Sequence, residues 1–226
     1  MKKIVLNLFL AFVFVNGLSQ TNSFIYPDFI GETFESINNN LDWKILVNAK
    51  GDLNNDNLED LALVLESKDS VLEKRCTGCK ILKQKPRVIL VLINEDNTPK
   101  VIVQNNKFIA RGDEGGMATY IEPELSIEDG LLTIFYEYTR SNQSYTFKKV
   151  KNNFKIVSAK SMYVHAASGN YENDEFDFLN NKIISKTGNI SLEGEKIEVL
   201  EIKVKPKGLS EFGEMYEWEV VENKYL

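Results

Sequence analysis

Apolar and polar residues alternate in several segments of the chain, and this alternation predicts β-strands. It is clearest over residues 43–50, 200–204 and 216–220. Because successive side chains of a strand point to opposite faces of a sheet, each of these segments predicts a strand with one buried face. Residues 61–65 and 87–93 are apolar along most of their length. They predict strands that are buried on both faces.

Short turn signals rich in Asn, Asp and Gly separate the strand-like segments. They lie at residues 94–99, 128–130, 151–153 and 180–181. No helical crossover of about 10–15 residues separates neighbouring strands, so the strands are expected to pair in antiparallel fashion. We therefore predict a mainly β fold of antiparallel sheets, arranged as a meander or a sandwich, or as part of a propeller.

Helical periodicity is confined to the N-terminal part of the chain. Ile30, Phe34 and Ile37 are spaced to share one face of a helix over residues 28–37, although Gly31 lowers the helix propensity of this segment. The sequence therefore predicts one short N-terminal helix.

The first 19 residues have the pattern of a secretory signal peptide. Lys2 and Lys3 precede an apolar run over residues 4–15, and small residues occupy positions −3 and −1 of a cleavage site after Ser19. The run has about 12 residues, whereas a membrane-spanning helix needs about 20. We therefore predict export to the periplasm, the cell surface or the medium, with no membrane span after cleavage. Because no Pro-, Ser- or Gly-rich linker divides residues 20–226, they are predicted to form a single β-rich domain.

The charge balance argues against a nucleic acid partner. The 226-residue chain has 27 Lys and Arg against 33 Asp and Glu, which gives a formal net charge of −6. It contains no basic block long enough to follow a phosphate backbone.

One chemical motif stands out, an acidic loop over residues 52–60. Asp52, Asn54, Asp56 and Asp60 place side-chain oxygens at loop positions 1, 3, 5 and 9. Ca²⁺ prefers six to eight oxygen ligands at about 2.3–2.6 Å, and a tight turn directs alternate side chains and one backbone carbonyl, here that of Leu58, to a common point. The loop therefore predicts a calcium site, and the alternative is a solvated acidic turn that binds no metal.

The residues around the loop argue against an EF-hand. Asn57 occupies position 6, where the turn needs a positive φ that Asn tolerates well. Leu63 occupies position 12, where an EF-hand carries its bidentate Glu. The segment that follows the loop has the pattern of a strand, not of a helix.

Residues 50–64, Lys-Gly-Asp-Leu-Asn-Asn-Asp-Asn-Leu-Glu-Asp-Leu-Ala-Leu-Val, resemble the calcium loop and following strand of FG-GAP/VCBS repeats, the blade motif of integrin-α-type β-propellers. The resemblance implies a structural Ca²⁺ held by Asp52, Asn54, Asp56, the Leu58 carbonyl and Asp60. The chain has one copy, whereas a closed propeller needs at least about four blades. The whole chain is also similar to small exported bacterial proteins that carry a single such loop after a Trp-Lys-Ile-Leu strand and have no assigned activity.

The two cysteines, Cys76 and Cys79, form a C-x-x-C pair in a basic, irregular segment. Export to an oxidising compartment favours a local disulfide. A redox-active pair is the alternative, because Lys74, Arg75 and Lys80 would lower a thiol pKa, but no βαβ pattern surrounds the pair. A zinc site would need two further ligands.

Catalytic chemistry has few candidates. His165 is the only histidine, and it lies at a predicted strand end, near serines that have no nucleophile-elbow pattern. Acidic residues are numerous, so a carboxylate pair for glycoside hydrolysis stays open. The candidates are Glu122, Glu124, Asp174 and Asp177.

Aromatic residues gather in the central predicted hairpins. Strand alternation places Tyr136 and Tyr138 on one face and Phe135 on the other. Core packing is the expected role of most of them, and the alternative is an exposed platform for sugars or a partner protein. The set comprises Phe135, Tyr136, Tyr138, Tyr145, Phe147, Phe154 and Tyr163.

These observations lead to one functional hypothesis and two alternatives. The hypothesis is an exported, calcium-stabilised β domain that binds an unknown protein or glycan. One alternative is a secreted hydrolase that uses paired carboxylates. The other is an inhibitory or protective partner of another exported protein, which is expected to expose a large apolar patch.

Overall fold

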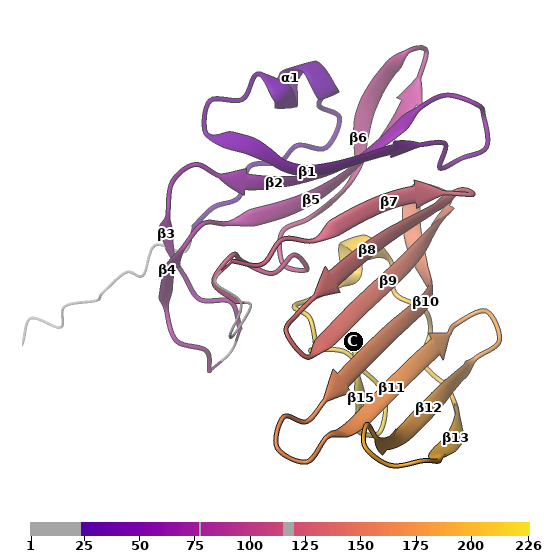
Figure 1. The fold of residues 1–226 in the computed structure, drawn as a ribbon. Helices are drawn as coiled ribbons and strands as arrows, with labels where there is room; N and C mark the ends of the chain where they lie inside the picture. The colour runs from indigo at the N-terminus through magenta and orange to yellow at the C-terminus, as the bar shows by residue number, and fades with distance from the viewer. Residues whose placement is uncertain (1–23, 77, 115–119) are drawn as a thin grey trace, which may run out of the picture.

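The computed structural model describes residues 24–76, 78–114 and 120–226 (Figure 1). The predicted signal peptide, residues 1–19, lies outside the described residues. The described chain is mainly β and antiparallel, with one short α-helix, as the sequence predicts.

A four-stranded sheet forms the N-terminal part of the fold. Its order is β1-β2-β5-β6, and every neighbouring pair is antiparallel. Its strands are β1 (Trp43–Gly51), β2 (Asp60–Ser67), β5 (Arg87–Glu95) and β6 (Thr98–Asn105).

A seven-stranded meander forms the second sheet, in the order β13-β12-β11-β10-β9-β8-β7. Each strand pairs with its neighbours in sequence because tight turns reverse the chain. Asp129, Lys151 and Asn181, all within predicted turn signals, adopt positive φ in these turns. The strands are β7 (Glu124–Glu128), β8 (Leu131–Glu137), β9 (Ser141–Val150), β10 (Asn153–Val164), β11 (Asn170–Asp177), β12 (Lys182–Asn189) and β13 (Glu195–Glu201).

Small elements complete the fold. A hairpin of β3 (Val71–Glu73) and β4 (Leu82–Gln84) connects β2 to β5, and β14 (Glu219–Val221) pairs with β15 (Lys224–Tyr225) near the C-terminus. The 3-10 helix η1 (Leu209–Glu211) precedes this second hairpin.

Two predicted strands and the helix have other bounds than the sequence pattern suggests. The strand predicted over 200–204 ends at Glu201, and that over 216–220 begins only at Glu219. Helix α1 (Phe34–Asn38) begins six residues later than predicted, with the Thr33 side chain accepting the N–H of Ser36. Gly31 lies before it with a φ of 84°, and its N–H bonds to β6, which keeps this part of the segment out of the helix.

The core has two parts, one on each face of the four-stranded sheet. In β2, Ala62 and Val64 enter the core shared with the seven-stranded sheet, whereas Leu61, Leu63 and Leu65 pack beneath α1 and the N-terminal segment. The same division holds in β5. The continuous apolar runs therefore supply both faces, as predicted.

The C-terminal segment, residues 202–226, covers the face of the seven-stranded sheet that carries its buried side chains, here called the inner face. It appears in yellow behind the sheet in Figure 1. Phe212 and Trp218 pack there in an edge-to-face contact. The buried Asn105 side chain of β6 donates to the carbonyls of Leu209 and Phe212 at 2.7 and 2.8 Å. This contact joins the first sheet to the C-terminal segment.

Candidate functional sites

The acidic loop is closed around the carboxylate of Asp52. Its Oδ1 accepts the N–H groups of Asn54 and Asn55 at 3.1 and 2.6 Å, and its Oδ2 accepts that of Asn57 at 2.8 Å. Desolvation tends to raise the pKa of this carboxyl, but the backbone N–H groups, with Asn57 first, lower it below its usual value. Asn57 has a φ of 65°, as predicted for position 6.

Asp60 anchors the end of the loop in the protein interior. Its side chain is fully buried, and its two oxygens accept the N–H groups of Leu53 and Asn94, both at 2.8 Å. Burial raises the pKa of this carboxyl despite these hydrogen bonds, and the nearby charges of Asp56 and Asp52 raise it further. The loop is thereby fixed to the end of β5.

Of the other predicted calcium ligands, Asp56 is exposed, whereas Asn54 and Leu58 are half-buried. The Asn54 amide donates to Asp56 Oδ2 at 2.7 Å, and Asp56 Oδ1 accepts the N–H of Leu58 at 2.8 Å. The loop offers the carboxylate and amide oxygens that suit a hard cation. Within the described parts of the chain, no group of three or more His, Cys, Asp or Glu side chains is arranged to hold a metal ion. Calcium binding by this loop stays a prediction.

Cys76 and Cys79 form a disulfide, with their Cα atoms 5.2 Å apart. The bridge lies between β3 and β4, and the N–H of Cys79 bonds to the carbonyl of Cys76 at 3.3 Å. The predicted local disulfide is therefore confirmed.

The structure also contains a network of buried charges that the residue pattern does not predict. Arg87 is fully buried, and its Nε and Nη2 donate to Glu66 Oε2 at 2.9 and 2.8 Å. Its Nη1 donates to the carbonyls of Ala110 and Ile121 at 2.9 and 2.7 Å. Because an unpaired buried charge is costly, these contacts hold the segment after β6 against the sheet.

Arg111 forms a second buried ion pair beside the first. Its Nε and Nη2 donate to the two carboxylate oxygens of Glu73 at 2.9 and 2.8 Å. Burial tends to raise the pKa of Glu73, but the hydrogen bonds and charge of Arg111 lower it to about 2. Tyr26 and Gln84 also donate to Glu73, which joins the N-terminal segment to the β3–β4 hairpin.

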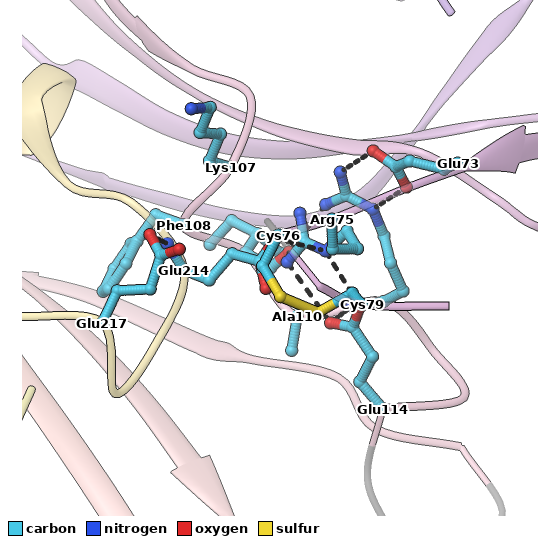
Figure 2. Close-up of polar contacts among 12 residues, drawn as sticks. Glu73, Arg75, Cys76, Cys79, Lys107, Phe108, Ala110, Glu114, Glu214 and Glu217 are labelled. Atoms are coloured by element: carbon cyan, nitrogen blue, oxygen red, sulfur yellow. Dashed lines mark hydrogen bonds and ion pairs between the residues drawn. A yellow bond between two sulfur atoms is a disulfide. The ribbon is translucent and has the colours of Figure 1, made fainter. Parts of the chain in front are cut away.

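Figure 2 shows the outer part of this network, where Arg75 lies beside the disulfide. Arg75 Nε is 2.9 Å from Glu114 Oε1 and 3.6 Å from Glu214 Oε1. Burial raises the pKa of Glu214 although Arg75 opposes this effect. A hollow of about 240 Å³ adjoins these charges, with Tyr138 and Tyr216 among its lining residues.

The larger hollow, of about 460 Å³, lies at one end of β10, β11 and β12. Its aromatic lining consists of Tyr163, which is 52% exposed, and Tyr171. The polar lining residues are His165, Asn170, Glu172 and Thr187.

The turn next to this hollow contains the single histidine. His165 Nδ1 lies 3.0 Å from Ser168 Oγ and accepts the N–H of Ser168 at 3.3 Å. Ser168 Oγ also accepts the N–H of Asn170 at 3.2 Å. These contacts close the turn between β10 and β11 and orient the imidazole at the rim of the hollow.

The four acidic residues proposed for hydrolysis are not brought together. Asp174 and Asp177 point to opposite faces of β11, and Asp174 pairs with Lys224. Asp177 instead accepts backbone N–H groups of the following turn. Glu124 lies on β7, which three strands separate from β11, and Glu122 precedes β7.

The central aromatic residues divide between core and surface. Tyr136 and Tyr145 are fully buried, whereas Phe135 lies half-buried on the other face, as alternation predicts. Core packing is therefore confirmed for Tyr136, Tyr145, Phe147 and Phe154. Tyr163 is the member of the set that lines the larger hollow.

Comparison of the chain with protein-family models, curated protein sequences and solved structures finds no match. None of the helices in the described residues is long and apolar enough to cross a membrane.

Proposed function

We propose that the protein is an exported, calcium-stabilised β module that binds a glycan in the larger hollow of the seven-stranded sheet. Export is supported by the signal-peptide pattern of residues 1–19 and by the disulfide, which suits an oxidising compartment. The structural role of calcium is supported by the spacing of oxygen-bearing side chains in residues 52–60.

The observation that carries the proposal is the lining of the hollow. A hollow of about 460 Å³ lies within the usual size range of ligand sites, roughly 300–1,000 Å³. Aromatic rings pack against the apolar C–H faces of sugars. Amide, carboxylate and hydroxyl groups such as those of Asn170, Glu172 and Thr187 exchange hydrogen bonds with sugar hydroxyls. The hollow combines both kinds of group on paired strands.

The site is prepared for binding, since several of its side chains are held in place. The Tyr171 hydroxyl donates to Glu195 Oε2 at 3.2 Å, and Lys224 pairs with Glu172. The hydrogen bonds of Ser168 fix His165. Holding lining groups in position lowers the side-chain entropy that the protein loses when a ligand binds.

Titration calorimetry of residues 20–226 with cellohexaose, maltohexaose and chitohexaose tests the proposal. At least one hexasaccharide is expected to bind, and Tyr163→Ala is expected to weaken its binding about 2- to 12-fold, as the loss of one aromatic contact implies. Tyr216→Ala is the matched control, because Tyr216 is 53% exposed and lies outside the hollow. Failure of all three sugars to bind, or equal effects of the two substitutions, would contradict the assignment.

A further inference from the structure

β13 forms an edge of the seven-stranded sheet and pairs only with β12 among the described strands. The N–H of Ile202, just after β13, bonds to Asn181 at 2.9 Å, on the β12 side. In an antiparallel strand, the backbone groups of one residue point toward a given neighbouring strand, and those of the next residue point away from it. Residues an even number of positions from Ile202 therefore point toward β12, and residues an odd number of positions away point outward. The N–H and C=O groups of Ile197 and Val199 therefore face away from the sheet.

The other edges of the two large sheets are covered or irregular. Val101 of β6 exchanges backbone hydrogen bonds with Gly31 and Glu32 of the N-terminal segment. β1 has a register shift between Ile45 and Val47, and β7 lies against β1. β13 pairs with β12 without a register shift and contains no proline. Regular edges of this kind accept a further strand.

The side chains of β13 also leave apolar surface exposed. Ile197 and Val199 are 55% and 64% exposed on the outer face of the sheet. Ile190 and Leu192, in the preceding turn, are more exposed still. β-branched residues on an edge strand favour cross-strand contacts with an added strand.

The charge on the edge identifies the kind of strand that fits. Residues 193–201 contain four Glu and one Lys. Glu195 and Glu201 flank Ile197 and Val199 on the same face, because side chains two residues apart share a face. A second copy of this strand would place like charges together, whereas a basic strand would pair opposite charges across the edge.

We propose that β13 is a docking edge for an extended basic segment of a partner polypeptide. The segment adds an eighth strand by antiparallel pairing, with β-branched residues opposite Ile197 and Val199 and Lys or Arg opposite Glu195 and Glu201. Main-chain hydrogen bonds between β13 and the segment provide the affinity. The side chains of the segment that face Glu195, Ile197, Val199 and Glu201 provide the specificity. This surface adjoins the glycan hollow at Glu195, which accepts the Tyr171 hydroxyl, but none of its residues lines the hollow.

The peptide Lys-Thr-Val-Lys-Val-Thr-Lys, labelled with fluorescein, is the probe for an anisotropy titration with residues 20–226. Its two Val residues lie opposite Ile197 and Val199, and their N–H groups complete the new ladder. The same peptide with both Val nitrogens methylated keeps the side chains and loses these donors. We expect the parent peptide to bind at least tenfold more tightly than the methylated peptide.

Substitution of Val199 tests the same contact from the protein side. Val199→Pro removes an outward N–H and leaves the ladder bonds to β12 in place, since proline is tolerated on an edge strand. It is expected to weaken peptide binding at least tenfold, whereas Val199→Ala, which keeps the N–H, is expected to change it less than threefold. If Val199→Pro does not fold, the methylated peptide still decides the question.

Three results would overturn the proposal. One is equal binding of the two peptides, and another is no binding of the parent peptide at millimolar protein concentration. The third is a concentration-dependent dimer of the protein alone that Val199→Pro abolishes, which would identify a second copy as the occupant. Tyr163→Ala is expected to leave peptide binding unchanged. The peptide titration therefore tests the docking edge independently of the glycan proposal.

Discussion

The buried carboxylate of Asp60 accepts the backbone N–H of Asn94 at 2.8 Å, and this bond joins the acidic loop to the far end of β5. Its other oxygen accepts the N–H of Leu53. The residue that ends the acidic motif therefore has a structural role that needs no metal ion.

Asp60→Ala is expected to destabilise the protein by about 2–6 kcal/mol, because two N–H groups lose their acceptor and each unsatisfied buried group costs about 1–3 kcal/mol. Urea unfolding in the presence of EDTA measures this loss without any contribution from calcium. Glu59→Ala is the control, since Glu59 is an exposed neighbour whose change is expected to stay within about 0.5 kcal/mol. Similar small effects of both substitutions would show that Asp60 does not anchor the loop.

The ion pair of Glu73 with Arg111 predicts a stability change in acid. The folded protein holds the pKa of Glu73 at about 2, below the usual 4.5, so the folded state favours the ionised form. The contribution of the Glu73–Arg111 ion pair to the free energy of unfolding is fully present above about pH 4.5 and is lost as the pH falls toward about 2. Urea unfolding at a series of pH values measures this loss.

Glu73→Gln provides the comparison for that series. It is expected to cost about 3–5 kcal/mol at pH 7, because the buried guanidinium of Arg111 loses its counter-charge, and to flatten the stability profile between pH 2 and 4.5. Glu59→Gln removes only an exposed ion pair with Lys50 and is expected to leave the profile unchanged. An unchanged profile in Glu73→Gln would contradict the assigned role of Glu73.

The strands that alternation and turn signals predicted are largely those of the structure, because each rests on local side-chain periodicity. The apolar runs of β2 and β5 are the clearest cases, since their two faces enter two different cores. The helix begins later than residue spacing predicts because Gly31 and Glu32 bond to β6, and spacing contains no information on such a tertiary contact.

The buried charge network was not predictable from residue spacing. Arg87 and Glu66 flank two apolar runs, and only the register of β2 with β5 shows that they are opposite each other. Arg111 and Glu73 are 38 residues apart and lie in segments without a regular pattern. The hollow at Tyr163 likewise depends on how three strands end together, which composition does not reveal.

The signal-peptide pattern predicts where the mature chain begins. Expression in a Gram-negative bacterium is expected to yield a secreted or periplasmic product that starts at Gln20, as intact-mass measurement can establish. Leu10→Arg places a charge within the apolar run and is expected to retain the full-length chain in the cytoplasm. Lys44→Arg, in the predicted mature chain, is the control that leaves export unchanged. Recovery of the unprocessed wild-type chain from the cytoplasm would contradict the prediction.

The calcium site is tested by thermal unfolding with and without the ion. With a dissociation constant of about 10⁻⁴–10⁻³ M, millimolar Ca²⁺ is expected to stabilise the protein by about 0.4–1.4 kcal/mol. For a chain of this size, that corresponds to a rise in melting temperature of roughly 1–5 °C, which EDTA reverses.

Asp56→Ala is expected to abolish the rise, because Asp56 is a predicted ligand on the exposed side of the loop. Asp69→Ala removes an exposed carboxylate outside the loop and is expected to keep it. Identical calcium responses of the wild type and Asp56→Ala would reject the site and leave residues 52–60 as an acidic turn held by its own hydrogen bonds.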